Sequence, residues 1–300
     1  MSKQEIMFGT DPEAFATYNK KGKLYALPPV FFREDLEIDV KDNGDHPIYL
    51  EDGKGGMVHE DGAAFEICVP PTTNWEEMWE QCSDLVKSFN SLYLDHLPPT
   101  LVNSSLAMIP TVNWDVERWE HKGPTWEYAT RFGCDKDYDA WKEFAPPEEV
   151  DVMDASKHPW RYAGGHLHFS LLGSDEIKNR PLDIVACLAY TAGLAAIAYG
   201  NNLELEKLRS FRYGKPTKYR VQNYSNGAVG IEYRTPSASW LGDKNLAAQV
   251  FGWAEIGIRS LFLGGALEKV QKFKVETANA IMTADKAMAL ALLKEVGALV

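Results

Sequence analysis

Cysteine is scarce in this chain, and the cysteines that it has are widely separated. The 300 residues include four of them, Cys68, Cys82, Cys134 and Cys187. None belongs to a closely spaced pair of the kind found in zinc sites and redox motifs. Disulfide-stabilised secreted domains have a much higher cysteine density. The scarcity therefore predicts a protein of a reducing compartment, with the cytoplasm as its expected location.

Positive charge is also in short supply. The chain has 31 lysines and arginines against 43 aspartates and glutamates, which gives a formal net charge of -12. Nucleic acids and anionic membranes attract basic surfaces. We therefore expect no nucleic acid and no membrane among the partners, whereas a surplus of carboxylates suits divalent metal ions.

Neither a signal peptide nor a membrane span is expected. The first residues, Met1 to Glu5, lack the apolar core and cleavage signal of a secretory peptide. The one membrane-like run, Leu182 to Tyr199, carries Asp183 and has no flanking aromatic or basic anchors. This run predicts a buried core helix.

Internal repeats, low-complexity tracts and linkers are missing too. With 45% hydrophobic residues the chain can bury a substantial core, so we expect a single domain over residues 1–300. Residues 111–160 differ from their surroundings, because they combine charges and the pair Pro146-Pro147 with several tryptophans. These are Trp114, Trp119, Trp126, Trp141 and Trp160. We expect an irregular insertion or lid there, with the tryptophans packing a small satellite core.

The local patterns predict strands and helices that do not alternate regularly. Strands are expected at residues 5–17, 63–69, 165–172 and 229–236, and hairpins rather than a helix at residues 22–56. Asn74 is the expected N-cap of a helix whose apolar positions recur with helical period. A second long helix is expected from Pro181 to Leu208. This mixture predicts an α+β domain with a mainly antiparallel sheet.

The most informative stretch is Gly164 to Ser170. Its two histidines and its serine alternate with leucine and phenylalanine, and alternate side chains of a strand point to opposite faces. The pattern predicts a strand with one face packed under helices. The other face, which carries His166, His168 and Ser170, is expected to be solvent-accessible and to bind a ligand.

Three other predicted strands also place polar groups on one face. They contribute Asp11 and Glu13, Glu66 near Asp61, and Glu232 with Arg234. Hard divalent cations prefer carboxylate oxygens and accept a histidine in a mixed site, so the set predicts a site for one or two Mg²⁺ or Mn²⁺ ions. A basic segment with Arg209, Arg212, Lys215 and Arg220 would neutralise an anionic substrate, for which phosphate is the natural candidate.

These motifs follow one another in an order that resembles the glutamine synthetase-like carboxylate–amine ligases. The chain is most similar to the phage-encoded amidoligases called COOH-NH2 ligase type 2, over roughly residues 8–240. The segments Phe132-Gly133-Cys134 and Pro236 to Trp240 share in the likeness. The resemblance implies an antiparallel sheet curved around an ATP and metal site with helices on its convex face. If the chain is phage-encoded, it implies the host cytoplasm as location.

The resemblance also implies roles for individual residues. Glu13, Asp61 and Glu66 would hold one metal ion, and Asp11, His166 and Glu232 a second one beside the nucleotide phosphates. The residues that would approach the nucleotide are His168, Ser170 and Arg220. Those that would neutralise the transferring phosphate and the acyl-phosphate are Arg212, Lys215, Arg220 and Arg234. The implied reaction is phosphorylation of a carboxylate by ATP, followed by attack of an amine to form an amide.

Such a reaction needs no side-chain nucleophile, because the phosphate supplies the leaving group and the protein supplies positioning and charge. A general base must accept the proton of the amine, and Glu60 and Asp61 are the candidates. The carboxylate and amine substrates could be small molecules, peptides or proteins, and the oligomeric state is open.

Each feature also has a plainer interpretation. Histidines in a His-x-His pattern are often structural, Glu232 and Arg234 could simply form a surface ion pair, and residues 209–220 could be a solvated loop. Cys134 is expected to be a buried small residue rather than a nucleophile. Two alternative functions stay open: a cupin-like metal oxygenase, since two histidines and a glutamate suit non-haem iron, and a non-catalytic scaffold or virion-associated binding protein that retains the fold.

Overall fold

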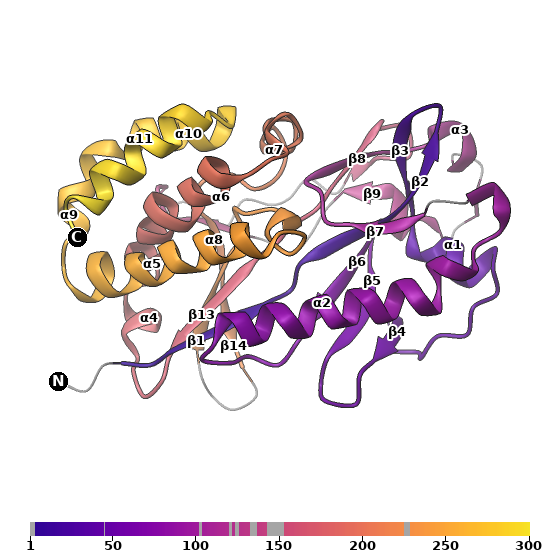
Figure 1. Ribbon diagram of the computed structural model, residues 1–300, viewed down its shortest axis with the longest axis horizontal. Coiled ribbons are helices and arrows are strands. Elements are labelled where there is room, and N and C mark those ends of the chain that lie inside the picture. The colour runs from indigo at the N-terminus through magenta and orange to yellow at the C-terminus, as the bar shows by residue number, and fades with distance from the viewer. Residues whose placement is uncertain are drawn as a thin grey trace.

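A computed structural model shows an α+β architecture in which two sheets meet end to end and helices cover one side (Figure 1). The structure describes residues 4–44, 46–101, 104–119, 122–123, 126–132, 137–142, 153–224 and 229–300. Gly133, Cys134 and the pair Pro146-Pro147 lie outside the described residues.

The first sheet is antiparallel and has the strand order β1-β13-β15-β14-β10. Its strands are β1 (Ile6–Thr10), β10 (Tyr138–Asp139), β13 (Leu167–Leu171), β14 (Lys218–Asn223) and β15 (Val229–Tyr233). The register places Gly9, His168, Glu232 and Arg220 side by side in one row across four strands. Three chemically active side chains from distant segments therefore share one line on the sheet.

The second sheet is mixed and has the order β12-β8-β3-β2-β6-β5-β4, with β7 also paired to β2. Its strands are β2 (Glu13–Lys20), β3 (Lys23–Leu27), β4 (Ile48–Glu51), β5 (Met57–Asp61), β6 (Ala64–Cys68), β7 (Ser105–Ala107), β8 (Thr111–Asn113) and β12 (Trp160–Tyr162). The short strands β9 (Arg131–Phe132) and β11 (Met153–Asp154) pair with each other. Only the contact between β3 and β8 is parallel among the described pairs.

The chain passes from the first sheet to the second at Asp11-Pro12. The prediction of one strand over residues 5–17 is wrong at this point, because β1 ends at Thr10 and β2 begins at Glu13. Proline has no N–H for a sheet ladder, but the Pro12 carbonyl accepts a hydrogen bond from the Ile67 N–H at 3.0 Å. Asp11 and Glu13 therefore lie where the two sheets join.

Helices cover the apolar face of the first sheet. The side chains of Leu167, Phe169, Ile231 and Tyr233 are buried there, under α4 (Glu176–Asn179) and α5 (Pro181–Leu188). This confirms the predicted alternation of apolar and chemical positions along β13.

The helix predicted from Pro181 to Leu208 is divided. α5 continues through a wider turn, Ala189–Gly193, into α6 (Leu194–Tyr199), and Gly200 then leaves the helical conformation before α7 (Leu203–Ser210) begins. α10 (Lys274–Thr283) and α11 (Lys286–Gly297) pack on α6. Gly200 has extended backbone angles, and a Cβ there would lie 2.4 Å from the Ala196 carbonyl oxygen.

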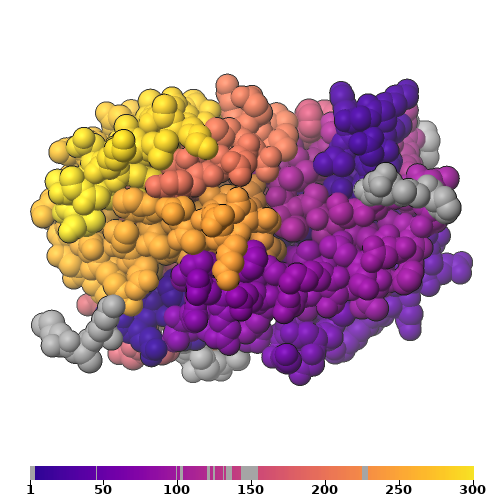
Figure 2. All heavy atoms as spheres, viewed as in Figure 1, coloured from indigo at the N-terminus to yellow at the C-terminus, as the bar shows by residue number. Residues whose placement is uncertain are grey.

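The helix predicted after Asn74 is confirmed. α2 (Trp75–Leu92) begins with the Glu76 N–H donating to Asn74 Oδ1 at 3.0 Å. On the face seen in Figure 2 it lies beside α8 (Lys244–Ile256). The rings of Trp75 and Phe251 stack there with centroids 5.7 Å apart.

The tryptophan-rich segment packs differently from the prediction. Trp119 stacks on Trp126 at 4.9 Å and contacts Phe31 at 5.7 Å, and these rings belong to the main hydrophobic core, not to a satellite of it. Phe31 lies in α1 (Pro29–Glu34), a helix within the range where only hairpins were expected. Pro28 and Pro29 start this helix because proline is favoured in a first helical turn.

Two helical stretches, Pro181–Tyr199 and Lys244–Leu263, are long and apolar enough to cross a membrane by length and composition. In their most apolar windows, 72% and 50% of the residues are buried inside the protein. Buried core helices pass the same test, so the two stretches are weak evidence for a membrane span.

The N-cap of α2 gives a stability prediction. Asn74→Ala removes the acceptor for the Glu76 N–H and should lower the free energy of unfolding by about 1 kcal/mol, as measured by urea denaturation. Ser88→Ala, on the exposed side of the same helix, is the matched control and should change it by less than about 0.5 kcal/mol. Equal values for the two variants would show that the cap does not stabilise the helix.

Candidate metal centre

The junction of the two sheets collects the polar side chains predicted from separate strands. His166 is at the centre of this cluster. Its Nδ1 lies 3.0 Å from Asp11 Oδ1 and 3.3 Å from Glu232 Oε1, and its Nε2 lies 3.9 Å from Glu13 Oε1. Glu13 is paired directly opposite Glu66 in the second sheet. The structure thus brings ligand candidates of both sheets into one group.

A second arrangement within the group involves His168. Ligand atoms of Asp11, His168 and Glu232 all lie within 4.8 Å of one another, and His168 Nε2 is 3.2 Å from Asp11 Oδ1. This nitrogen is buried and accepts or donates no hydrogen bond within the part of the chain that the structure describes. A buried imidazole nitrogen beside two carboxylates fits a metal ligand, whereas the sequence pointed to a nucleotide contact.

The side of the cluster on the second sheet is made by β5 and β6. Asp61 Oδ1 accepts a hydrogen bond from the Tyr128 hydroxyl at 2.9 Å. Glu66 Oε1 is 3.2 Å from His59 Nε2 and accepts a hydrogen bond from the Cys68 thiol at 3.3 Å. His59 and Cys68 were not among the predicted site residues, although strand alternation places them on the face of Asp61 and Glu66.

The electrostatics of Glu13 reflect a surplus of carboxylates. Burial raises its pKa, and Asp61 and Glu66 raise it further, while the Gly164 N–H and Arg234 act against this change, so that the pKa reaches about 8. The Gly164 N–H donates to Glu13 Oε2 at 2.8 Å. A bound cation would favour the ionised carboxylate.

The imidazoles have the opposite influence on Asp11. Burial alone would raise its pKa, but His168 and His166 lower it well below its usual range. Burial and then Arg234 lower the pKa of His166. Burial also acts to lower the pKa of His168, but Asp11, Glu232 and Glu66 together raise it above its usual value. The two neighbouring histidines therefore differ: His166 favours its neutral form and His168 holds a proton more strongly.

Two of the four predicted catalytic cations reach the cluster. Arg234 is 2% exposed and its guanidinium pairs with Glu232. Arg220 Nη1 lies 3.8 Å from Glu232 Oε1. Both side chains of this ion pair are buried, so Glu232 and Arg234 do not form a surface ion pair.

Arg212 and Lys215 have other positions. The Arg212 guanidinium lies over the ring of Phe132, 5.2 Å from its centroid, and its side chain is exposed. Lys215 follows Gly214 in a turn, where its carbonyl accepts a hydrogen bond from Thr235. The structure therefore does not bring these two predicted cations to Glu232.

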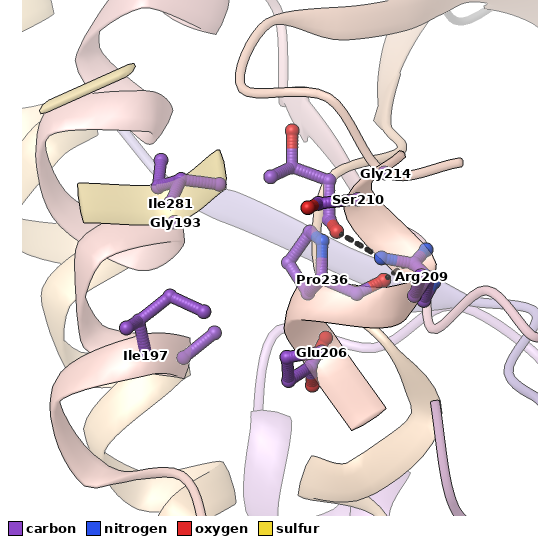
Figure 3. A pocket seen from close by; sticks show the side chains of 10 residues that line it. Gly193, Ile197, Glu206, Arg209, Ser210, Gly214, Pro236 and Ile281 are labelled. Carbon is purple, nitrogen blue, oxygen red and sulfur yellow. Dashed lines mark hydrogen bonds between the residues drawn. The ribbon is translucent and has the colours of Figure 1, made fainter. Parts of the chain in front are cut away.

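Arg209 has a structural place that the sequence did not reveal. It is buried and donates to the carbonyls of Ala163 at 2.5 Å, Thr235 at 2.7 Å and Pro236 at 3.2 Å. With Glu206 it lines a small cavity against α6 and α10 (Figure 3), and its guanidinium lies over the Tyr213 ring, 4.7 Å from the centroid. Arg209 ties the segment before β13 to the segment after β15.

Glycines permit this close packing. A Cβ on Gly164 would lie 2.2 Å from His166 Nε2, and one on Gly165 would lie 2.3 Å from the Ser237 carbonyl oxygen. Gly214 has a φ of +70°, and a Cβ there would overlap the Arg209 guanidinium. Gly164 is therefore needed for the imidazole to turn toward Glu13, and Gly165 for the close approach of the Ser237 backbone.

Tyr213 is the main residue that sequence reasoning missed. Its hydroxyl lies 2.7 Å from His166 Nε2, accepts a hydrogen bond from Arg234 at 2.8 Å and donates to Glu13 at 3.3 Å. No periodic pattern marks a turn residue of this kind. Gln222, by contrast, donates to Glu232 and could have been found by strand alternation from Arg220.

The site is more closed than predicted. Glu13, His166 and Glu232 are 7%, 2% and 1% exposed, and a solvent-accessible face was expected for them. The side chains of Asp11 and Glu66 each retain 18% exposure, so access is from their side. Ser170 is also buried, and its contact with a nucleotide stays a prediction.

Comparison with known proteins supports a family assignment. Residues 139–299 match the family model described as phage phiEco32-like COOH.NH2 ligase-type 2. No curated protein and no solved structure matches the chain. The match includes His166, His168, Glu232 and Arg234. It begins after Asp11, Glu13, Asp61 and Glu66, so the likeness over residues 8–138 rests on their motifs. The chain belongs to the phage phiEco32-like COOH-NH2 ligase type 2 family.

Proposed function

We propose that this protein is an ATP-dependent carboxylate–amine ligase that works through an acyl-phosphate with divalent metal ions, Mg²⁺ or Mn²⁺. The observation that carries the proposal is the buried junction where carboxylates of both sheets meet two imidazoles and Arg234. We extend the proposal to the fold, with the first sheet as the counterpart of the curved catalytic sheet of glutamine synthetase-like ligases.

Glu13, Asp61 and Glu66 would hold one hard cation, and Asp11, Glu232 and a histidine the other. Of the two proposed ligand sets, only that of Asp11, Glu232 and His168 has its ligand atoms within 4.8 Å of one another in the part of the chain that the structure describes; Glu13, Asp61 and Glu66 are farther apart and would have to close on an ion. His168 is the better candidate for that histidine, because its Nε2 lies 3.2 Å from Asp11 Oδ1 and its ligand atom falls within 4.8 Å of those of Asp11 and Glu232, while His166 Nε2 lies beside the Tyr213 hydroxyl. Bound divalent metals would supply neutralisation of phosphate oxygens.

The residues of the chain would position the reactants and stabilise charge. Arg234 and Arg220 converge on Glu232 from the same sheet face and would offset negative charge that develops on a transferring phosphate. The Tyr213 hydroxyl holds Glu13, His166 and Arg234 in fixed relation. The roles proposed for Arg212 and Lys215 require contact with a substrate group outside the cluster.

Of the two candidates for the base that accepts the proton of the amine, Asp61 rather than Glu60 lies at the site, and in that role it would leave the metal ion to Glu13 and Glu66. Glu60 is 2% exposed and forms an ion pair with Arg33 at 3.0 Å on the other side of β5. Asp61 lies with Glu66 and Glu13 and is positioned by the Tyr128 hydroxyl.

The family assignment favours a ligase over a cupin-like oxygenase, and turnover of ATP separates a ligase from a non-catalytic scaffold. Small molecules, peptides or proteins would supply the carboxylate and the amine. The cytoplasm, without nucleic acid or membrane partners, is the setting that we propose from composition and charge.

Loss of a ligand should abolish turnover. The assay is ADP release in the presence of Mg²⁺ and pooled carboxylates and amines. We expect Glu13→Gln and His168→Gln each to lower this rate by about 100-fold or more, because each removes a donor from a metal site. Glu51→Gln, at an exposed glutamate of β4, is the control and should keep the wild-type rate. Wild-type turnover by Glu13→Gln and His168→Gln would refute the ligand assignment, and absence of ATP turnover in the wild type would support the scaffold.

The pKa of Glu13 gives a pH prediction. The pKa of Glu13 is about 8 in the folded protein, against an ordinary value of 4.5. At a pH between these two values the carboxyl group takes up a proton when the protein folds. The stabilisation that comes from this proton uptake is lost as the pH rises from about 5 to 8. With a chelator present, the melting temperature of Glu13→Gln should rise relative to that of the wild type as the pH increases over this range. Added Mg²⁺ should raise the melting temperature of the wild type more than that of the variant. Parallel curves with and without Mg²⁺ would contradict a cation at Glu13.

A further inference from the structure

Beside the proposed magnesium site lies a group of three different donors. His59 of β5 is paired with Glu66 of β6, and Cys68 follows two residues later on the same face. The distances are 3.2 Å from His59 Nε2 to Glu66 Oε1, 3.3 Å from Cys68 Sγ to Glu66 Oε1 and 3.4 Å from Cys68 Sγ to His59 Nε2. The three atoms form a nearly equilateral triangle.

This triangle has the size of one face of a tetrahedral zinc site. Zinc bonds of about 2.3 Å to sulfur and about 2.0–2.1 Å to nitrogen or oxygen imply edges of about 3.6 Å from sulfur to the other donors, and about 3.3 Å between nitrogen and oxygen. The observed edges differ from these by only a few tenths of an ångström. The donors therefore need little movement to bind one ion.

The donor types select a different ion from the neighbouring cluster. A thiolate is a soft ligand and an imidazole suits zinc, whereas Mg²⁺ and Mn²⁺ prefer oxygen. Glu13 of β2 and His59 of β5 flank Glu66 on opposite sides, and Asp61 is paired with Ala64, two residues before Glu66, whereas Cys68 lies two residues after it. Two chemistries therefore share one carboxylate.

Access and local charge also favour a cation. The side chains of His59 and Glu66 are 13% and 18% exposed, and Cys68 is half-buried, which leaves the fourth position open to water. The Glu66 carboxylate beside the thiol and the imidazole would attract a divalent ion.

We propose that His59, Glu66 and Cys68 bind a thiophilic divalent cation of the Zn²⁺ class, with water as the fourth ligand. The S–H bond of Cys68 breaks on binding, its proton passes to the solvent, and a bond from sulfur to the metal forms without any change of oxidation state. Binding of Zn²⁺ takes the Glu66 carboxylate away from the proposed magnesium site, and Zn²⁺ therefore inhibits the ligase. This last consequence rests on the proposed function, but the binding itself does not.

Cobalt is the probe, because Co²⁺ takes zinc sites and its bond to a thiolate gives a charge-transfer absorption in the near ultraviolet. The intact protein, loaded with Co²⁺ in excess Mg²⁺, should show this band, and Zn²⁺ should bleach it. Cys68→Ser should remove the band, and His59→Asn should weaken Co²⁺ binding by about 10-fold or more. Cys82→Ala and Cys187→Ala, at two buried core cysteines, are the matched controls and should retain the band.

The outcomes are distinct. A wild-type protein without the band, or Cys68→Ser with the full band, would overturn the site and leave His59 and Cys68 as hydrogen-bonding partners of Glu66. A band that depends on Cys68 in a protein without ATP turnover would support the site and refute the proposed function. In an active protein, equal inhibition of the wild type and Cys68→Ser by Zn²⁺ would overturn the competition for Glu66.

Discussion

Charge balance in a buried joint is the constraint on which the rest of this structure depends. Carboxylates from both sheets meet where β1 passes into β2, and several of them are almost completely buried. Buried charges require partners, and Arg234 and the two imidazoles supply only part of the positive charge. Burial and the neighbouring carboxylates raise the pKa of Glu13, whereas His168 and His166 lower the pKa of Asp11. A divalent cation would restore the balance with both carboxylates ionised.

The joint is held by groups that have no chemical role in the proposed reaction. Pro12 ends one strand and accepts a hydrogen bond from the neighbouring sheet. Gly164 lets the backbone pass close to His166, and Arg209 fastens two connecting segments through three carbonyl oxygens. This backbone framework explains why functional side chains from four strands can meet within a small volume.

Glu66 links two different donor chemistries. On one side it faces Glu13, in surroundings rich in oxygen. On the other it contacts His59 and Cys68, which offer nitrogen and sulfur. Since the preferences of hard and thiophilic cations differ, one carboxylate in this position would couple the occupancy of the two proposed sites. The coupling follows from the order of residues along β6, where Glu66 and Cys68 are two positions apart on one face.

The sequence by itself determined which side chains share a strand face or a helix stripe, as for His166 with His168 and for the helix that begins after Asn74. Such periodicity is a local property of the backbone. Only the tertiary structure decided that β1 ends before Asp11, that Glu13, His166 and Glu232 are closed to solvent, and that Tyr213 joins them. The physical reason is that these features depend on pairing between distant segments, such as the 155 residues that separate Asp11 from His166, and no local pattern reports which strands will meet.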